Sequence, residues 1–578
     1  MRIRARWLAL LFAALFPLHA LAQAPDAEDD DDEPPPPAAQ APKPRPTAKL
    51  PPQELSEEFL YSFLLSEIAA QRGSAGIAAQ TYLDLAKQTR DPRVARRAVE
   101  VANFARAPEL ALEAARIWQE TDPDSPQALR TVTVLLVNAR RVDDAVPYLA
   151  RLLRTNGAAP GGLMQLGQLL GQNADKAANL RVVRKLAESY PQAPEAHFAI
   201  AQAALAANEE TVALQELSRA GALRPGWDLA AIFEAQILRR RSPGEAIERL
   251  GAFLDKHPNA RDVRMNYARL LVGEKRFPEA RTQFERLLSL HKDDAEAIYG
   301  VGLLAMQAKD YGTAEANLTR LLEIGFRDPN GLRFTLAQIA EEQKDWPRAI
   351  GWYESIRRGE HATQARMRTA NALAKQGRLD EARKFLQSVS VGDGERVQLL
   401  IAEAQLLREA SRHGDAFELL GKALEKNPQQ PELLYDQALT AEKLNRMDVL
   451  ESNLRAVIQV KPDHAHAYNA LGYSLADRNE RLPEARKLIE KAIELAPEDY
   501  YIMDSLGWVL YRMGDLKGAA QQLKRAWKGR PDGEIGAHLG EVLWVLGERA
   551  EAELVWREAL EASPDNDTLQ KTIQRLRK

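Results

Sequence analysis

The chain has 578 residues, too many for one compact hydrophobic core, so several domains or a repeat array are expected. Hydrophobic residues make up 45% and aromatic residues 6%, and segments with strand-like alternation are scarce, which is typical of an all-α protein. The formal net charge of −4 is too small to favour nucleic acid or an acidic membrane as a partner. The absence of cysteine excludes disulfides, thiolate metal sites, cysteine nucleophiles and lipid attachment to cysteine.

Residues 1–22 have the three parts of a secretory signal peptide. Three arginines precede an apolar run over residues 7–18, and Ala20–Ala22 form an A-x-A cleavage site. A short membrane anchor is the alternative, but the run is shorter than the ~20 residues that a span needs. No later apolar run is long enough to cross a bilayer. We therefore expect export, cleavage before Gln23, and a periplasmic protein that associates at most peripherally with the outer membrane.

Residues 23–54 are of low complexity. An acidic run over residues 28–33 is followed by prolines at 34–37 and by a basic, proline-rich stretch at 42–46. Like charges repel and proline disfavours helix and sheet, so this segment is predicted to be an extended, disordered tether. A docking tail for a basic partner is the alternative.

The stretch Tyr500–Pro531 predicts two amphipathic helices joined by a tight turn at Gly514 and Asp515. It matches the tetratricopeptide pattern W-x2-L-G-x2-Y…A-x3-F…P, with Met503 at the Trp position and Leu510 at the Tyr position. Small residues are expected where the two helices cross, because larger side chains would push the backbones apart. The residues predicted to hold the stack together are Met503, Leu506, Gly507, Leu510, Ala519, Leu523 and Ala526.

The same pattern recurs along the chain with starts 33 to 35 residues apart. One such unit cannot bury its own apolar faces, so the repetition predicts a right-handed α-solenoid of about 15 units over residues 55–566. The segment 567–578 is polar and helical in pattern, as a capping helix should be. Units near Pro160 and Thr363 match weakly. The predicted starts are Phe59, Pro92, Pro126, Pro160, Pro194, Trp227, Arg261, Ala295, Asn330, Thr363, Val397, Pro431, Ala465, Tyr500 and Gly533.

No nucleotide-binding loop, nucleophile elbow or metalloprotease motif is found, and the repeats leave no room for a separate catalytic domain. His464 and His466 beside Asp463 suggest a metal site, but they fall at a helix start without an i, i+4 histidine partner. A solvated loop is the preferred interpretation. We therefore expect a protein that is not an enzyme, with no catalytic residues, metal or cofactor.

A candidate binding groove follows from the face of each first helix that does not pack on the second helix. In stacked repeats of this kind, positions 2, 5, 9 and 12 line the concave groove. Aromatic side chains are typical anchors for a bound peptide. The alternative is that these rings fill contacts between adjacent repeats. The candidate residues are Tyr501, Asp504, Trp508 and Tyr511, with Tyr473 and Trp544 from the neighbouring units.

A second candidate lies in the unit that starts at Thr363. Arg368, Asn371 and Lys375 resemble part of the carboxylate clamp by which some tetratricopeptide domains hold a peptide C-terminus. The adjacent units offer Gln338 and Gln405 instead of further basic groups, so the resemblance is partial.

Two stretches resemble a narrower family. The N-terminal ELSEEFLYSFLLSEIAAQRG…YLDLAKQTRDPRVARRAVEVA and the C-terminal NALGYSLADRNERLPEARKLIEKAIELAPEDYYIMDSLGWVLYRMGD are similar to an exported tetratricopeptide family of proteobacteria. That family includes a lipoprotein adaptor that brings peptidoglycan hydrolases to a carboxyl-terminal processing protease. The resemblance implies a non-catalytic scaffold in the cell envelope. The chain departs from that adaptor because it has no cysteine to acylate.

These observations together predict a scaffold that binds proteins or extended peptide segments along its groove, through several weak contacts whose combined avidity is high. The partners implied by the resemblance are a carboxyl-terminal processing protease and clients such as cell-wall hydrolases. The alternative is a structural component of an exopolysaccharide export or secretion machine.

Overall fold

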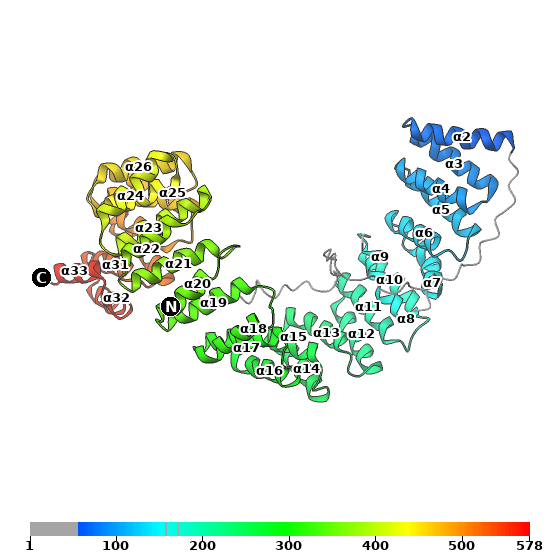
Figure 1. Cartoon of the computed structure of the whole chain (residues 1–578), viewed down its shortest axis with the longest axis horizontal. Helices are drawn as coiled ribbons and strands as arrows, with labels where there is room; N and C mark the ends of the chain where they lie inside the picture. Colours follow the sequence, from blue (N-terminus) through cyan, green and yellow to red (C-terminus); the bar gives the residue numbers. More distant parts are fainter. Residues whose placement is uncertain (1–55, 156–158, 172) are drawn as a thin grey trace. The chain divides into compact units, whose positions relative to one another are not determined.

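The computed structural model describes residues 56–155, 159–171 and 173–578, so the signal peptide and tether predictions for 1–54 lie outside the described residues. Within these ranges the ordered elements are α-helices and one 3-10 helix, with no strand, which confirms the all-α prediction (Figure 1). Across the same ranges, every helix is too short or too polar to cross a membrane. The chain divides into two compact units, residues 1–317 and 318–578, which are described separately.

The first unit holds the helices from α2 to α17 and the first part of α18, which crosses the division. Their bounds are α2 Glu57–Gln71, α3 Ala75–Thr89, α4 Pro92–Phe104, α5 Pro108–Thr121, α6 Pro126–Asn138, η1 Asp143–Ala145, α7 Val146–Thr155, α8 Ala159–Met164, α9 Leu166–Leu170, α10 Lys176–Ala187, α11 Pro194–Ala206, α12 Glu210–Leu223, α13 Asp228–Arg241, α14 Pro243–Lys256, α15 Arg261–Gly273, α16 Phe277–Leu290, α17 Ala295–Gln307 and α18 Tyr311–Glu323.

The second unit holds the rest of α18 and the helices that follow it. Their bounds are α19 Pro329–Glu342, α20 Trp346–Glu354, α21 Ala362–Lys375, α22 Leu379–Ser388, α23 Asp393–Glu409, α24 His413–Lys426, α25 Pro431–Lys443, α26 Met447–Val460, α27 Ala465–Asp477, α28 Leu482–Leu495, α29 Tyr500–Arg512, α30 Leu516–Gly529, α31 Gly533–Leu546, α32 Arg549–Ala562 and α33 Asp567–Leu576.

Helix pairs stack in sequence order in both units, as expected for a solenoid. Each first helix packs on the helix that follows it, for example α11 on α12 and α29 on α30. First helices of successive pairs also touch, as α27 touches α29 and α29 touches α31. A helix begins at, or a few residues from, each predicted repeat start. The 3.6-residue period of the apolar positions therefore located the helices correctly.

The pair α29 and α30 shows why the repeat needs its small residues. An added Cβ on Gly507 would lie 2.4 Å from Leu523 Cγ, so only glycine permits this close crossing. The turn uses Gly514, whose φ of +88° is a left-handed conformation that side chains disfavour. Asp515 then caps α30 by accepting a hydrogen bond from the Gly518 amide at 2.9 Å. The predicted helix, turn and crossing residues of this unit are confirmed.

The weakly matching unit near Pro160 has a broken first helix. In place of one long helix, the described residues form α8 and α9, which are 6 and 5 residues long. Gly161, Gly162, Gly167 and Gly171 occur in this segment, and glycine disfavours helix because ordering its backbone costs more entropy than for other residues. The glycine content of this segment therefore explains why its first helix departs from the repeat pattern.

Candidate binding surface on the C-terminal repeats

The candidate groove residues lie on three adjacent first helices of the second unit, α27, α29 and α31. The first contact is between Asp504 of α29 and His538 of α31. His538 Nδ1 lies 2.9 Å from Asp504 Oδ2, and both side chains are almost fully buried. A buried carboxylate requires such a partner, because an unpaired buried charge is very costly. The pair therefore fastens α31 to α29.

The charge environment of His538 favours its protonated form. Burial by itself would lower the pKa of this imidazole, but the nearby charge and hydrogen bond of Asp504 raise it above its ordinary value. Glu534 and Glu541 on the same helix act in the same direction. The proximity of Asp504 therefore favours the protonated imidazole in this contact.

Trp508 is buried in the same contact. Its ring stacks on His538 with centroids 4.2 Å apart, and the centroid of the tilted Tyr511 ring is 5.2 Å from its own. Only 6% of Trp508 is exposed. For Trp508 and Asp504, this burial supports the alternative that the side chains fill contacts between adjacent repeats.

Tyr511 and Trp544 also make contacts between helices. The Tyr511 hydroxyl donates to Glu541 Oε1 at 3.1 Å, and burial together with the Glu541 charge raises the pKa of Tyr511 to about 12. Trp544 is half-buried, with its ring 5.4 Å from Trp556 and the Arg549 guanidinium 4.9 Å from its centroid. Both residues combine a structural contact with a partly accessible surface.

Tyr501 is the exposed aromatic residue of the predicted set. It is 42% exposed, and the Arg530 guanidinium lies 4.7 Å from its ring centroid, in cation–π geometry. Asp532 is near the Tyr501 hydroxyl, at 3.5 Å. These three side chains present an aromatic face, a cation and a carboxylate together, which suits a polypeptide that carries both apolar and charged groups.

Tyr473 lies on the other side of the Asp504–His538 pair. Its ring centroid is 6.2 Å from that of His538, and its pKa is raised by burial and then by the charge of Glu534. Two buried polar atoms nearby, Asn469 Oδ1 of α27 and Trp508 Nε1 of α29, have no hydrogen-bond partner. Other buried atoms of the described residues, such as Trp556 Nε1 in the core, are unpartnered too, so such atoms do not by themselves mark a ligand site.

Sequence reasoning missed His538 and Arg530, which contact Asp504 and Tyr501 of the predicted set. His538 occupies position 6 of its repeat, outside the positions considered for the groove. Arg530 lies at the end of the preceding second helix. A pairing of the carboxylate at position 5 of one unit with a base in the next unit is the pattern that could have revealed His538.

The carboxylate clamp prediction concerns α21. Arg368 is exposed and its guanidinium lies 3.6 Å from the carboxylate of Glu341 on α19, so an ion pair already engages it. Asn371 is half-buried and Lys375 is exposed at the helix end. The structure thus places the three residues on one helix, with a carboxylate beside the first.

His464 has a structural role at the start of α27. Its Nδ1 accepts a hydrogen bond from the Ala467 amide at 3.1 Å, which caps α27. The ring packs 5.0 Å from Tyr435, and burial lowers the pKa of His464. In the described part of the chain, no three acidic or histidine side chains cluster in a way that could hold a metal ion.

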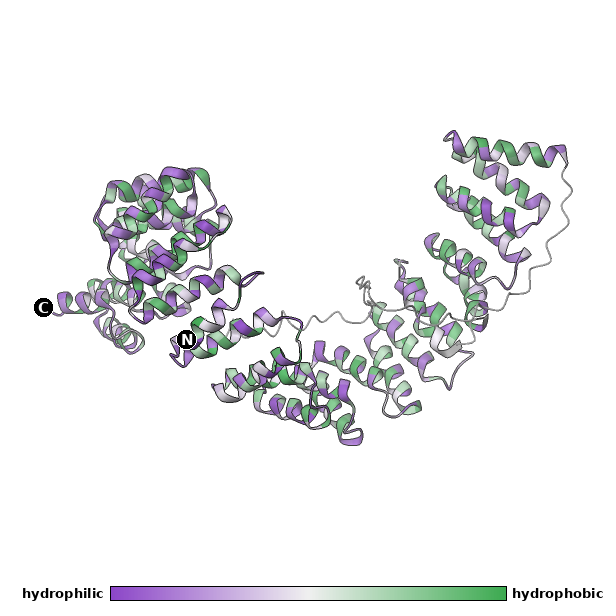
Figure 2. Ribbon diagram, in the orientation of Figure 1, coloured by the Kyte–Doolittle hydropathy of each residue, from purple (hydrophilic) through white to green (hydrophobic). Residues whose placement is uncertain are grey.

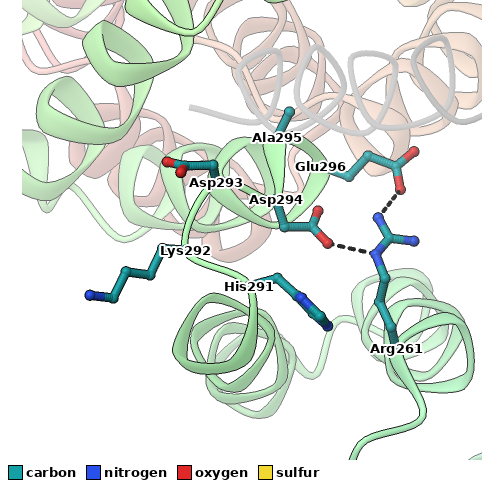
Figure 3. Close-up of a pocket in the computed structure, with 7 residues that line it drawn as sticks. All are labelled: Arg261, His291, Lys292, Asp293, Asp294, Ala295 and Glu296. Atoms are coloured by element: carbon teal, nitrogen blue, oxygen red, sulfur yellow. Dashed lines mark hydrogen bonds and ion pairs between the residues drawn. The ribbon is translucent and has the colours of Figure 1, made fainter.

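The first unit has an open hollow between α15 and α17 that is lined mainly by residues with charged side chains (Figure 3). Arg261 reaches across it to Asp294 at 2.7 Å and to Glu296 at 3.5 Å. Asp294 also caps α17 through the Ala297 amide. Arg261 therefore pairs with both carboxylates and joins neighbouring repeats.

Comparisons with known proteins agree with this architecture. A family model described as "Tetratricopeptide repeat" matches residues 238–301, and another with the same description matches 299–361, 354–390, 451–500 and 505–567. The TPR repeat-containing protein PA4667 of Pseudomonas aeruginosa is 34% identical over 522 residues, 90% of this chain and 88% of that protein. The chain therefore belongs to the tetratricopeptide-repeat family.

More distant relatives share only part of their length or sequence. Cellulose synthase operon protein C of Pseudomonas fluorescens is 24% identical over 79% of this chain, which spans 35% of that longer protein. Among solved structures, the tetratricopeptide protein TTC0263 of Thermus thermophilus matches 31% of this chain and 98% of its own, with 25% identity and a TM-score of 0.29. Tetratricopeptide-repeat proteins act as scaffolds that bind other proteins. As a member of this family, the chain is such a scaffold.

Proposed function

We propose that this protein is a non-catalytic scaffold of the cell envelope that binds extended segments of other proteins along α27, α29 and α31. The observation that carries the proposal is the exposed Tyr501, which has the Arg530 guanidinium over its ring and Asp532 near its hydroxyl. These side chains offer ring stacking, charge pairing and hydrogen bonding to one polypeptide.

The adaptor role is the specific form of this proposal. The scaffold would present clients such as cell-wall hydrolases to a carboxyl-terminal processing protease, which would cleave them while the scaffold itself performs no chemistry. Support comes from the resemblance of its N- and C-terminal repeats to the exported family of proteobacteria and from the leader-like residues 1–22. Affinities on the order of micromolar per contact would let clients be released after transfer.

The binding surface is tested by placing a photo-crosslinking amino acid at Tyr501 in living cells. Tyr500 is the matched control, since it is 36% exposed and adjacent in sequence but about 100° away around the helix, against Gly529. We expect protein adducts from position 501 and few from position 500. Equal adducts from both positions, or none from either, would contradict a binding role for this surface.

Partner identity and location are tested separately. Mass spectrometry of the adducts should find a protease or a cell-wall hydrolase, and fractionation should find the protein in the periplasm unless residues 1–22 are deleted. Cytoplasmic fractionation of the intact chain would overturn the envelope assignment. Turnover of a nucleotide sugar by the purified protein would overturn the non-catalytic one.

A second candidate function is supported by the relatives named cellulose synthase operon protein C. In that case the chain would be a structural component of a polysaccharide export machine. Co-fractionation with a synthase or an outer-membrane pore, together with unchanged hydrolase levels in a deletion strain, would favour this candidate over the adaptor.

A further inference from the structure

The first helix of the chain's described part, α2, exposes a continuous apolar face. The large side chains on it are between 36% and 68% exposed, and Figure 2 shows α2 coloured hydrophobic along much of its length. Elsewhere in the described residues, large apolar side chains that are this exposed are scattered over many helices. Contiguous exposed apolar patches mark interaction sites in proteins. The exposed residues of α2 are Leu60, Tyr61, Phe63, Leu64, Leu65 and Ile68.

This face corresponds to the one that a preceding repeat covers in an interior unit. Tyr61 and Ile68 occupy positions 3 and 10 of their repeat and are 68% and 47% exposed. The same positions in α29 are Ile502 and Val509, which are fully buried in a cluster with Ile489 of the preceding helix α28. The stripe on α2 therefore has the chemistry of an interior surface, and none of the described helices precedes it to cover it.

Three possible covers do not fit this face. Residues 23–55 of the chain contain only two large apolar side chains, Leu50 and Leu55. The C-terminal helix α33 turns its apolar residues inward and offers no matching face to a second copy. An anionic membrane is disfavoured because α2 carries Glu57, Glu58 and Glu67 and no lysine.

We propose that α2 pairs with α2 of a second copy of this chain in an antiparallel two-helix contact. Placing the two-fold axis between Leu64 and Leu65 brings Tyr61 opposite the partner subunit's Ile68. It also brings Glu57, in the first turn of the helix, opposite the partner subunit's Arg72, which caps the helix end. The face is thus complementary to itself in both apolar character and charge, as an isologous contact requires.

The size of the contact predicts its strength. Two facing 15-residue helices bury less than the roughly 1,200–2,000 Å² of a standard stable interface. The dimer is therefore expected to dissociate in the micromolar range and to be visible only when concentration is varied. Its function would be to bring two binding surfaces together, so that a client with two segments is held more tightly.

Sedimentation velocity of the purified protein from about 1 to 100 μM tests the proposal. We expect a concentration-dependent dimer whose dissociation constant rises at least tenfold in Leu64→Arg. The matched control is Leu554→Arg, since Leu554 is 44% exposed on α32 and Leu64 is 49% exposed on α2. Far-UV circular dichroism should be unchanged in both variants because both side chains are already exposed.

Cysteine crosslinking tests the register of the two paired α2 helices. The chain has no cysteine of its own that could form a competing disulfide. A mixture of Tyr61→Cys and Ile68→Cys chains should form the mixed disulfide in preference to either homodimer. A Glu57→Arg substitution should weaken the dimer, and adding Arg72→Glu to the same chain should restore it. A protein that stays monomeric throughout, or a dimer that Leu64→Arg leaves intact, overturns the proposal. So does α2 capturing lipid vesicles or another protein without self-association.

Discussion

The two ends of the described chain differ in whether the terminal helix exposes its apolar side chains to solvent. At the C-terminal end, α33 buries Leu569, Thr572 and Ile573 and shows charged residues to solvent. At the N-terminal end, α2 keeps an interior-like apolar face exposed. A repeat array needs a polar outer face at its ends to stay soluble and monomeric. The difference therefore separates an end that terminates the stack from an end that is chemically able to continue it.

The largest expected difference between the ends is in the cost of truncating an apolar side chain. Leu569→Ala removes a fully buried leucine from the cap, where it packs with Trp556, and should lower the free energy of unfolding by about 2–5 kcal/mol. Leu60→Ala, at a side chain that is 48% exposed on α2, should change it by less than about 0.5 kcal/mol. Amide hydrogen exchange read separately over α31–α33 and α2–α4 measures both. Equal losses at the two ends would show that α2 is covered.

The next effect concerns the small residue at repeat position 8, which is Gly507 in α29 and Ser66 in α2. Gly507→Ala places a methyl group 2.4 Å from Leu523 Cγ and should cost about 1–3 kcal/mol through overpacking. Ser66→Ala only removes a hydroxyl that donates to the Ser62 carbonyl at 2.8 Å, so the loss should be about 1 kcal/mol or less. Chemical denaturation followed by hydrogen exchange over each helix pair compares them. A cost-free Gly507→Ala would contradict the close crossing.

The ends should also respond to pH with opposite signs. The pKa of His538 is raised in the fold, so its stabilising contribution is complete below its ordinary pKa of about 6.5 and is lost as pH rises through the raised value. The pKa of Glu67 is lowered by hydrogen bonds from Tyr82 and Arg97. Its contribution is complete above the ordinary pKa of about 4.3 and is lost as pH falls through the lowered value.

Free energies of local opening from hydrogen exchange, corrected for intrinsic rates, measure this difference across pH 3 to 9. His538→Gln should flatten the alkaline decline over α29–α31 and leave the acid decline over α2–α3 in place. Glu67→Gln should do the reverse. If either variant flattens both declines, the two effects do not come from these groups.

The smallest expected effect is that of surface ion pairs. Arg577→Ala breaks a contact with Glu553 that closes α33 onto α32, and Arg97→Ala breaks the contact with Glu67 that joins α4 to α2. Both arginines are about half exposed, so each change should cost less than about 1 kcal/mol. Melting temperatures at low and high salt measure them. A larger loss for Arg577 would show that charge, as well as apolar packing, terminates the stack.

The sequence predicted the helices well and the site only partly. Tyr501 and Trp508 lie on the same predicted stripe and are both aromatic, yet Tyr501 is 42% exposed and Trp508 only 6%. Periodicity assigns residues to a helix face, but it does not say which part of that face the next repeat covers. His538 was missed for the same reason, since its partner Asp504 lies in another repeat.

The sequence by itself determined the repeat, its period, the crossing glycine and the turn, because these depend on contacts within one helix pair. It also determined the absence of cysteine chemistry. The tertiary structure alone decided which aromatic rings are buried between repeats, which are exposed beside Arg530, and that the apolar stripe of α2 is exposed among the described residues. Burial depends on how closely helices from different repeats approach one another in space. A local sequence pattern contains no information about that approach.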